Sequence, residues 1–275
     1  MARRAFLATL ITILALSGSA AAASTSWWRL PRQPTWYWQL NGKIRFGLPV
    51  KIYDVDAFTT TAAEVTRLHA EHRHVICYVD VGTAENWRSD YNQFPPSVLG
   101  SPNGWPGEVW LDIRQLGTIE PIMAARLRLC HEKGFDAVEP DNMEAALNES
   151  GFPITLAQQL AYNEWIAEES HSLHMAVLQK NDSEQTLEEN AFFDGALSEE
   201  CNQWWPECGA YLPYLESGRP VLNAEYKLKT QSFCSADALG GISGARFNLA
   251  LNGRRFEPCW DTAHAAGRRA SHRRT

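Results

Sequence analysis

Carboxylates recur directly after short apolar runs in this chain of 275 residues. The stretch "DAVEPDN" (136–142) places Glu139 and Asp141 two positions apart at the end of such a run, with Pro140 between them. Side chains alternate across an extended strand with a period of two, so both carboxylates belong to the same side. Proline cannot donate to a strand ladder, which suits a strand that is ending. The stretch therefore predicts a strand that directs two acids into one site.

Other apolar runs end in the same way. Acidic side chains end five of them, and these are Asp54, Asp56, Asp80, Asp112, Glu199, Glu200 and Glu225. The run at 175–181 ends in Lys180 and Asn181 instead. A lone acid after a strand is often a helix N-cap, and for Asp112 that interpretation is at least as good. Several clustered carboxylates raise one another's pKa and destabilise the fold unless a function compensates. We therefore favour a functional site.

Carboxylates without metal-ligating neighbours favour glycoside hydrolysis, in which one acid protonates the leaving oxygen and the other acts as nucleophile or base. The eight histidines avoid the predicted strand ends, and CxxC spacing and a G-x-S-x-G elbow are absent, which disfavours zinc and serine hydrolysis. An acidic calcium site stays open, although no EF-hand loop is present. We expect no cofactor and no metal.

The apolar runs alternate with helix-like stretches. Eight runs are strand candidates, at 36–40, 50–56, 75–81, 108–113, 135–141, 175–181, 193–200 and 220–226, and 245–251 is a further candidate. Such alternation predicts right-handed βαβ units in a parallel sheet. Eight units favour an α/β fold of the (β/α)8 TIM barrel type in a single domain, with a doubly wound open sheet as the alternative. In a barrel the carboxyl ends of all strands meet at one face, where barrel enzymes keep their chemistry.

Helical spacing supports this pattern. The buried face of the helix that ends near Gly134 should contain Ile119, Ile122, Met123, Leu127 and Cys130. Val65 and Leu68 should be buried in an earlier helix, and Thr155 should cap a later one. Shorter helices are expected near 183–190 and 209–216.

The N-terminus predicts export. Residues 1–23 combine Arg3 and Arg4, a short apolar region and small residues at 20–23, as a secretory signal peptide does. The general and twin-arginine routes both fit. We expect a hydrolase domain at 24–260 and a basic disordered tail at 261–275. The mature protein should be secreted, should not span a membrane, and is expected to be a monomer.

Cysteine number and charge agree with a secreted enzyme. Six cysteines permit three disulfides in fifteen connectivities; position along the sequence suggests Cys201 with Cys208 and Cys234 with Cys259, which leaves Cys77 with Cys130. The formal net charge is −7, and it becomes −9 once Arg3 and Arg4 are removed. An acidic protein is a poor candidate for binding nucleic acid and a better one for a cationic or neutral partner.

Seven motifs occur in a specific order between about residues 36 and 260: "WYWQL", "YDVDAF", "VICYVDVGTAENWR", "WPGEVWLDIR", "GFDAVEPDN", "LSEEC" and "VLNAEY". In this order they resemble the endo-α-1,4-polygalactosaminidase family of glycoside hydrolases (family 114). The resemblance implies a (β/α)8 barrel, secretion, and endo-hydrolysis of α-1,4-linked galactosamine in a microbial exopolysaccharide.

The resemblance also implies a catalytic pair. The aspartate of the "EPDN" motif is Asp141, and the glutamate before a cysteine is Glu199, with Glu200 as the alternative. We expect Asp141 to be the nucleophile and Glu199 the general acid/base. This mechanism needs carboxyl groups about 5–5.5 Å apart, whereas roughly 6.5–9.5 Å indicates inversion.

Deacetylated galactosamine carries ammonium groups, which acidic side chains at the mouth would attract. The substrate-binding candidates are Trp38, Asp54, Tyr78, Asp80, Glu139, Lys180, Glu200, Glu225 and Tyr226. Lys180 could lower the pKa of a neighbouring acid or form a structural ion pair, and both roles remain open. The aromatic residues could stack on sugar rings or belong to the core. A glycosidase for another α-linked sugar and a non-catalytic carbohydrate-binding barrel remain alternatives.

Overall fold

The computed structural model describes residues 26–204 and 207–260. The predicted signal peptide (1–23) and basic tail (261–275) lie outside these residues. Among the described helices, none has both the length and the apolar character that crossing a membrane requires.

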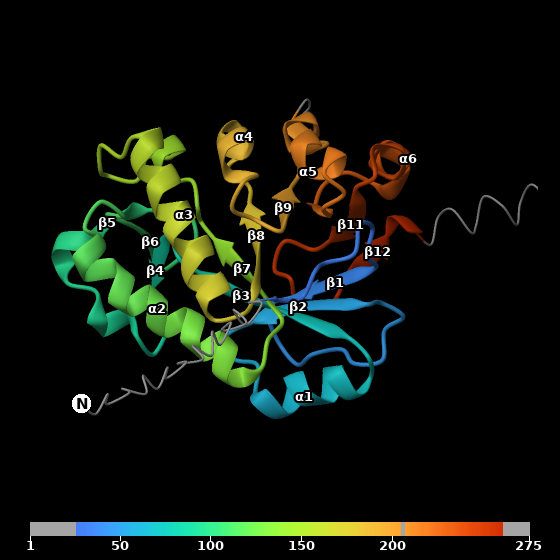
Figure 1. The fold of residues 1–275 in the computed structure, drawn as a ribbon, viewed down its shortest axis with the longest axis horizontal. Helices are drawn as coiled ribbons and strands as arrows, with labels where there is room; N and C mark the ends of the chain where they lie inside the picture. Colours follow the sequence, from blue (N-terminus) through green and yellow to red (C-terminus); the bar gives the residue numbers. More distant parts are fainter. Residues whose placement is uncertain (1–25, 205–206, 261–275) are drawn as a thin grey trace, which may run out of the picture.

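The main sheet contains eight parallel strands arranged as a nearly closed barrel (Figure 1). In sheet order these strands are β1 (Trp36–Gln39), β2 (Ile52–Asp56), β3 (His74–Asp80), β7 (Ala137–Asp141), β8 (Ala176–Lys180), β9 (Gly195–Glu199), β10 (Val221–Glu225) and β11 (Ser243–Phe247). A ninth strand, β12 (Phe256–Pro258), pairs antiparallel with β11. Trp36 of β1 donates its indole N–H to the carbonyl of Ser243 at 2.7 Å, which connects the first barrel strand to the last. The TIM barrel and the single domain are confirmed.

The predicted fourth barrel strand, 108–113, is wrong in its placement. Its residues form β6 (Glu108–Leu111), which pairs antiparallel with β4 (Thr83–Glu85) and β5 (Leu99–Pro102) in a separate three-stranded sheet. β11 supplies the eighth barrel strand instead. An apolar run indicates that a segment is extended, but its pairing partner is decided by the rest of the chain. This small sheet follows β3 and precedes α2, and it lies beside the barrel (Figure 1).

The helices surround the strands (Figure 1). They are α1 (Ala62–Ala70), α2 (Leu116–Lys133), α3 (Leu156–Ser172), α4 (Thr186–Glu189), α5 (Leu212–Glu216) and α6 (Thr230–Gly240), with short 3-10 turns at Tyr91–Gln93, Pro96–Val98, Ala145–Leu147, Ser183–Gln185 and Glu207–Tyr211. Thr155 caps α3 in a capping box with Gln158, as the sequence predicts. Gly134 ends α2 in the left-handed conformation, with φ 86°.

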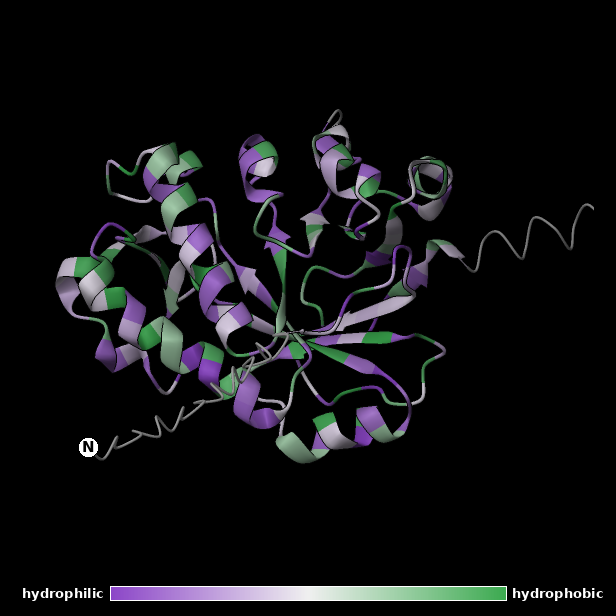
Figure 2. Cartoon of the chain, viewed as in Figure 1, coloured by the Kyte–Doolittle hydropathy of each residue, from purple (hydrophilic) through white to green (hydrophobic). Residues whose placement is uncertain are grey.

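Burial follows the predicted helix faces. Val65 and Leu68 of α1 are buried, as are all five residues predicted for α2, from Ile119 to Cys130. Hydrophobic and hydrophilic residues alternate along these helices, which suits elements that cover a core on one side (Figure 2). The strands of the barrel are buried along nearly their whole length, as expected for a parallel sheet covered by helices.

Three disulfides join elements of the fold. Cys77 of β3 pairs with Cys130 of α2, Cys201 pairs with Cys208 after β9, and Cys234 of α6 pairs with Cys259 near the end of the described chain. These are the pairings expected from the sequence.

Candidate active site

The carboxyl ends of the barrel strands open into a pocket of about 520 Å³. Of the candidate residues chosen from the sequence, six line this pocket: Trp38, Tyr78, Asp141, Lys180, Glu199 and Tyr226. Four others, Asp54, Asp80, Glu139 and Glu225, are fully buried and are not among the lining residues. The structure therefore separates the acids that face the pocket from those that lie behind its wall.

Asp141, the last residue of β7, is held by three donors. Lys180 Nζ lies 2.8 Å from its Oδ1, the Tyr78 hydroxyl donates to its Oδ2 at 2.7 Å, and the amide of Asn142 donates to its Oδ1 at 2.9 Å. Burial acts to raise the pKa of Asp141, but the charge of Lys180 and these hydrogen bonds outweigh it, so the pKa lies below its usual value. The result is an ionised, fixed carboxylate facing the pocket.

Glu199, the last residue of β9, is held in a similar way. Its Oε2 accepts a hydrogen bond from Asn181 Nδ2 at 3.0 Å, and its Oε1 accepts one from the Tyr226 hydroxyl. Its own amide donates to Asn181 Oδ1 at 2.9 Å, which fixes the strand end to the turn after β8. The side chain remains 28% exposed, more than the 19% of Asp141. Glu199 is thus fixed in position and remains accessible to solvent.

Lys180 joins the two carboxylates. Its Nζ lies 2.8 Å from Asp141, 3.3 Å from Glu199 Oε2 and 2.9 Å from Glu139 Oε1, and the side chain is only 1% exposed. Burial on its own lowers the pKa of a lysine, but these three carboxylates raise that of Lys180 well above its usual value. Because Asp141 Oδ1 and Glu199 Oε2 contact the same nitrogen, these two oxygens lie no more than about 6 Å apart.

Behind Lys180 lies a second carboxyl pair. Burial, and then the charge of Glu139, raise the pKa of Asp54 well above its usual range. Burial also raises the pKa of Glu139 to about 7, although Lys180 acts to lower it. Neither oxygen of Asp54 has a hydrogen-bond donor among the described residues, and the same is true of Glu139 Oε2. A proton on Asp54 supplies the missing donor, so we interpret Asp54 as a neutral acid that supports Glu139 from behind.

Asp80 shapes the wall of the pocket. Its Oδ1 accepts from the amides of Gly82 at 3.1 Å and Thr83 at 2.8 Å, and its Oδ2 accepts from Asn142 Nδ2 at 2.9 Å. Asn142 takes the left-handed conformation, with φ 62°. A Cβ atom at Gly82 would lie 1.7 Å from the carbonyl oxygen of Asn142, so this close approach requires glycine. Asp80 thus connects the turn after β3 to the turn that follows Asp141.

Glu200 and Glu225 do not share the position of Asp141 and Glu199 at the pocket. Glu200 has φ 58°, so its side chain leaves the alternation of β9, and its Oε2 pairs with the exposed Lys227 at 3.3 Å. Glu225 accepts from the amide of Asn202 at 2.9 Å, and burial raises its pKa to about 7. Neither residue lines the pocket. The geometry therefore favours Glu199 over Glu200 as the second acid.

The small sheet contributes two acids, Glu85 and Glu108, that were not among the candidates chosen from the sequence. Asp80, Glu85 and Glu108 each place a carboxylate oxygen within 4.8 Å of the others, and Glu85 and Glu108 line the pocket. Burial, the first cause in each case, raises the pKa of all three. Such a set of oxygens suits a cation, whether a metal ion or an ammonium group. Glu108 belongs to the motif "WPGEVWLDIR", but because this motif was assigned to a barrel strand, Glu108 was not expected at the pocket.

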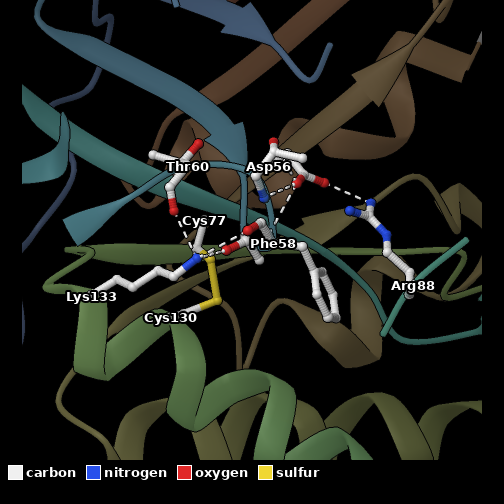
Figure 3. Close-up of a disulfide and its surroundings, with 9 residues drawn as sticks. Asp56, Phe58, Thr60, Cys77, Arg88, Cys130 and Lys133 are labelled. Carbon is white, nitrogen blue, oxygen red and sulfur yellow. Dashed lines mark hydrogen bonds and ion pairs between the residues drawn. A yellow bond between two sulfur atoms is a disulfide. The ribbon is translucent and has the colours of Figure 1, made fainter. Parts of the chain in front are cut away.

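The loop after β2 forms another part of the wall (Figure 3). Asp56 Oδ1 accepts from the amides of Phe58 at 3.0 Å and Thr59 at 2.8 Å, which closes the loop. Asp56 Oδ2 also pairs with Arg88 at 2.6 Å, and the guanidinium of Arg88 lies over the ring of Phe58. Because Asp56, Thr59 and Arg88 all line the pocket, this network fixes one of its edges.

Lys133 at the end of α2 supports the same loop from outside (Figure 3). Its Nζ donates to three loop carbonyls, those of Ala57, Phe58 and Thr60. The disulfide between Cys77 and Cys130 lies next to this lysine and ties α2 to β3. The loop is therefore held by a charged side chain and by a covalent bond between the elements beneath it.

Comparisons with known proteins agree with this geometry. The chain resembles the crystal structure of Aspergillus fumigatus Ega3 in complex with galactosamine, with a TM-score of 0.81 and 28% identity over 86% of this chain and 99% of that one. The glycoside hydrolase domain of PelA from Pseudomonas aeruginosa shares the fold, with a TM-score of 0.61 and 10% identity over 80% and 97% of the two chains. TtGalA, an α-galactosidase from Thermus thermophilus, shares the fold at a TM-score of 0.55 and 12% identity, over 78% and 58%.

No curated protein matches the chain significantly in sequence. The sequence model of glycoside-hydrolase family GH114, in contrast, matches residues 17–261, which is most of the chain. The match includes every barrel strand, Asp141 and Glu199. The chain therefore belongs to glycoside hydrolase family GH114 and is a glycoside hydrolase.

Proposed function

We propose that this enzyme cleaves internal α-1,4-galactosaminidic bonds in a cationic, partly deacetylated exopolysaccharide. The observation that carries the proposal is the pair of fixed carboxylates, Asp141 and Glu199, on either side of Lys180 in an acid-lined pocket. The similarity to Ega3, whose structure contains galactosamine, supports this class of sugar.

In the proposed reaction, an Asp141 oxygen attacks the anomeric carbon while the bond from that carbon to the leaving oxygen breaks. Glu199 donates its proton to the leaving oxygen, which departs as the hydroxyl of the shortened chain. Glu199 then takes a proton from water, whose oxygen attacks the anomeric carbon and releases Asp141 as a carboxylate. Two displacements return the original α configuration, which is the retaining outcome.

Lys180 and Tyr78 prepare Asp141 for this role. A nucleophilic carboxylate must be ionised, and Lys180 keeps it so despite burial. When Asp141 becomes an ester and loses its charge, Glu139 at 2.9 Å continues to neutralise Lys180. The buried ammonium is therefore paired throughout the reaction, which avoids the cost of an isolated buried charge.

The charge of the pocket favours a cationic sugar. Its lining includes the acids Asp56, Glu85, Glu108 and Glu144 in addition to the catalytic pair. The lining cations are Lys180 and Arg88, and both already pair with carboxylates at 3.3 Å or less. An ammonium group would therefore meet net negative charge, which favours its approach and binding.

We further propose that the enzyme acts as a monomer outside the cell. Residues 1–23 have the composition of a signal peptide, and disulfides persist in oxidising compartments. The three disulfides support this location.

The test is depolymerisation of galactosamine polymers that differ in acetylation, measured as new reducing ends. Asp141→Asn and Glu199→Gln should each reduce kcat by at least about 100-fold, whereas the matched control Glu200→Gln should retain most activity. The new reducing ends should appear as the α anomer in NMR spectra. Full activity of both catalytic variants would refute the residue assignment, and retention of polymer without any cleavage would identify a binding protein instead.

A further inference from the structure

Two half-exposed tryptophans stand at the rim of the catalytic pocket. Trp87 is 54% exposed and Trp105 is 50% exposed, and both line the same pocket as Asp141 and Glu199. Single exposed apolar side chains are common, but two large rings at the rim of one pocket suit a surface that a ligand covers. Among the described residues, neither ring stacks on another aromatic ring or receives a cation over its face. Each ring thus keeps exposed surface that a ligand could cover.

The small sheet brings together the two segments that carry the tryptophans. β4 and β6 run antiparallel with Glu85 opposite Glu108, and the amide of Asn86 donates to the carbonyl of Gly107 at 2.9 Å. Trp87 lies in the turn that follows β4, and Trp105 lies in the turn that precedes β6. The two tryptophans therefore come from adjacent strand ends at one edge of the sheet.

The loop that carries Trp105 is fixed by its own hydrogen bonds. Its amide donates to Asn103 Oδ1 at 3.0 Å, and its carbonyl accepts from the amide of Glu108 at 3.2 Å. Gly107 has φ 86°, and a Cβ atom there would lie 2.6 Å from the side chain of Asn86. The turn is therefore built around a glycine, and the backbone that carries Trp105 is pre-organised for binding.

Negative charge accompanies the rings. Glu85 lies two residues before Trp87 and Glu108 three residues after Trp105, and both glutamates line the pocket. Arg88 neutralises part of this charge through its contact with Glu85 at 2.6 Å, but Asp56 shares the same guanidinium. A sugar with an apolar face and an ammonium group matches this combination of flat rings and carboxylates.

We propose that Trp87 and Trp105 form a stacking subsite for a galactosamine unit of the substrate chain that lies away from the cleaved bond. This inference rests on the proposed function and specifies how the enzyme would select long chains. In this arrangement the barrel supplies the carboxylates that cleave the bond, while the inserted sheet binds a sugar unit of the polymer at a distance from that bond. Cleavage of long chains should therefore depend on the tryptophans, and cleavage of short ones should not.

The experiment compares kcat/KM on long galactosamine polymer with kcat/KM on the shortest oligosaccharide that the wild type cleaves. Trp87→Ala and Trp105→Ala should each lower the value for polymer by about fivefold to tenfold through a higher KM, with the value for the short substrate unchanged. Trp204→Ala is the matched control, because Trp204 is 62% exposed but does not line the pocket. Phenylalanine at either position should restore part of the loss, since it keeps an aromatic face.

Each other result counts against the subsite. Variants that match Trp204→Ala on polymer would overturn it while the proposed function stands, and an equal loss on both substrates would assign the tryptophans to the cleaved bond or to folding. Thermal unfolding of each variant checks the last case. If the wild type releases no reducing ends from any galactosamine polymer, the proposed function fails, and the subsite fails with it.

Discussion

Replacing Lys180 by methionine removes a buried ammonium group and keeps most of the side chain's volume. The ammonium contacts Glu139 at 2.9 Å and Asp141 at 2.8 Å, and hydrogen bonds to charged groups are worth about 1.5–3 kcal/mol each. Removing one partner of a buried ion pair costs about 3–5 kcal/mol, because the remaining charge is left unpaired. At about 2–4 °C per kcal/mol, Lys180→Met should lower Tm by roughly 6–20 °C.

The same substitution should change the pH dependence of catalysis. Burial acts to raise the pKa of Asp141, and in the wild type the charge and hydrogen bond of Lys180 help to hold it below its usual value; without Lys180 that pKa should rise. Because the proposed nucleophile must be ionised, the acid limb of kcat/KM should move to higher pH. The measurements are kcat/KM between about pH 3 and pH 8 and thermal unfolding at the pH of greatest stability.

Lys227→Met provides the control. Its ammonium pairs with Glu200 at 3.3 Å but is 67% exposed, so its loss should cost less than about 1 kcal/mol and leave the acid limb in place. If Lys180→Met shows the control's Tm and pH profile, the reasoning about the buried charge is refuted. A lower Tm with an unchanged acid limb would leave Lys180 a structural role alone.

Three further predictions concern stability. Replacing Cys77 and Cys130 by serine removes a link between residues 53 positions apart and should lower the unfolding free energy by about 4 kcal/mol. The same change at Cys201 and Cys208, which are 7 positions apart, should cost less. Equal losses of stability in thermal unfolding would contradict this chain-entropy argument. Burial raises the pKa of Glu139, Glu144, Asp182 and Glu225 to about 7, above the usual value near 4.5 or lower. The folded chain therefore binds more protons than the unfolded chain between these pH values, and Tm should fall as pH rises from about 5 to about 7.5; a rising Tm would show that other groups dominate. Asp54→Asn should change the unfolding free energy by less than about 1 kcal/mol, since an amide can donate to Glu139 as the neutral acid does. Asp54→Leu should destabilise the protein clearly, because leucine has no donor. A severe loss of stability in Asp54→Asn would mean that Asp54 is ionised.

Much of the barrel could be predicted from local pattern. The apolar runs became seven of the eight barrel strands, because a strand buried on both faces must be apolar along its length. The run at 108–113 is equally apolar, yet it pairs in the small sheet, whereas β11 contains Arg246 and gives a weaker signal. Pairing is a long-range property, so no local pattern could separate these two segments. Trp87, Trp105 and Glu85 were missed for the same reason, since they matter through that sheet's position beside the pocket.

Sequence alone determined that Glu139 and Asp141 share a side at the end of one strand, because this follows from strand periodicity and the order of residues. The tertiary structure decided how deep each acid lies. Asp141 reaches the pocket and Glu139 does not, although they are two residues apart on one strand. Lys180 contacts Glu139, Asp141 and Glu199, because neighbouring parallel strands bring their ends together. Exposure and pKa depend on what the adjacent strands and loops cover, and that information exists only once the chain has folded.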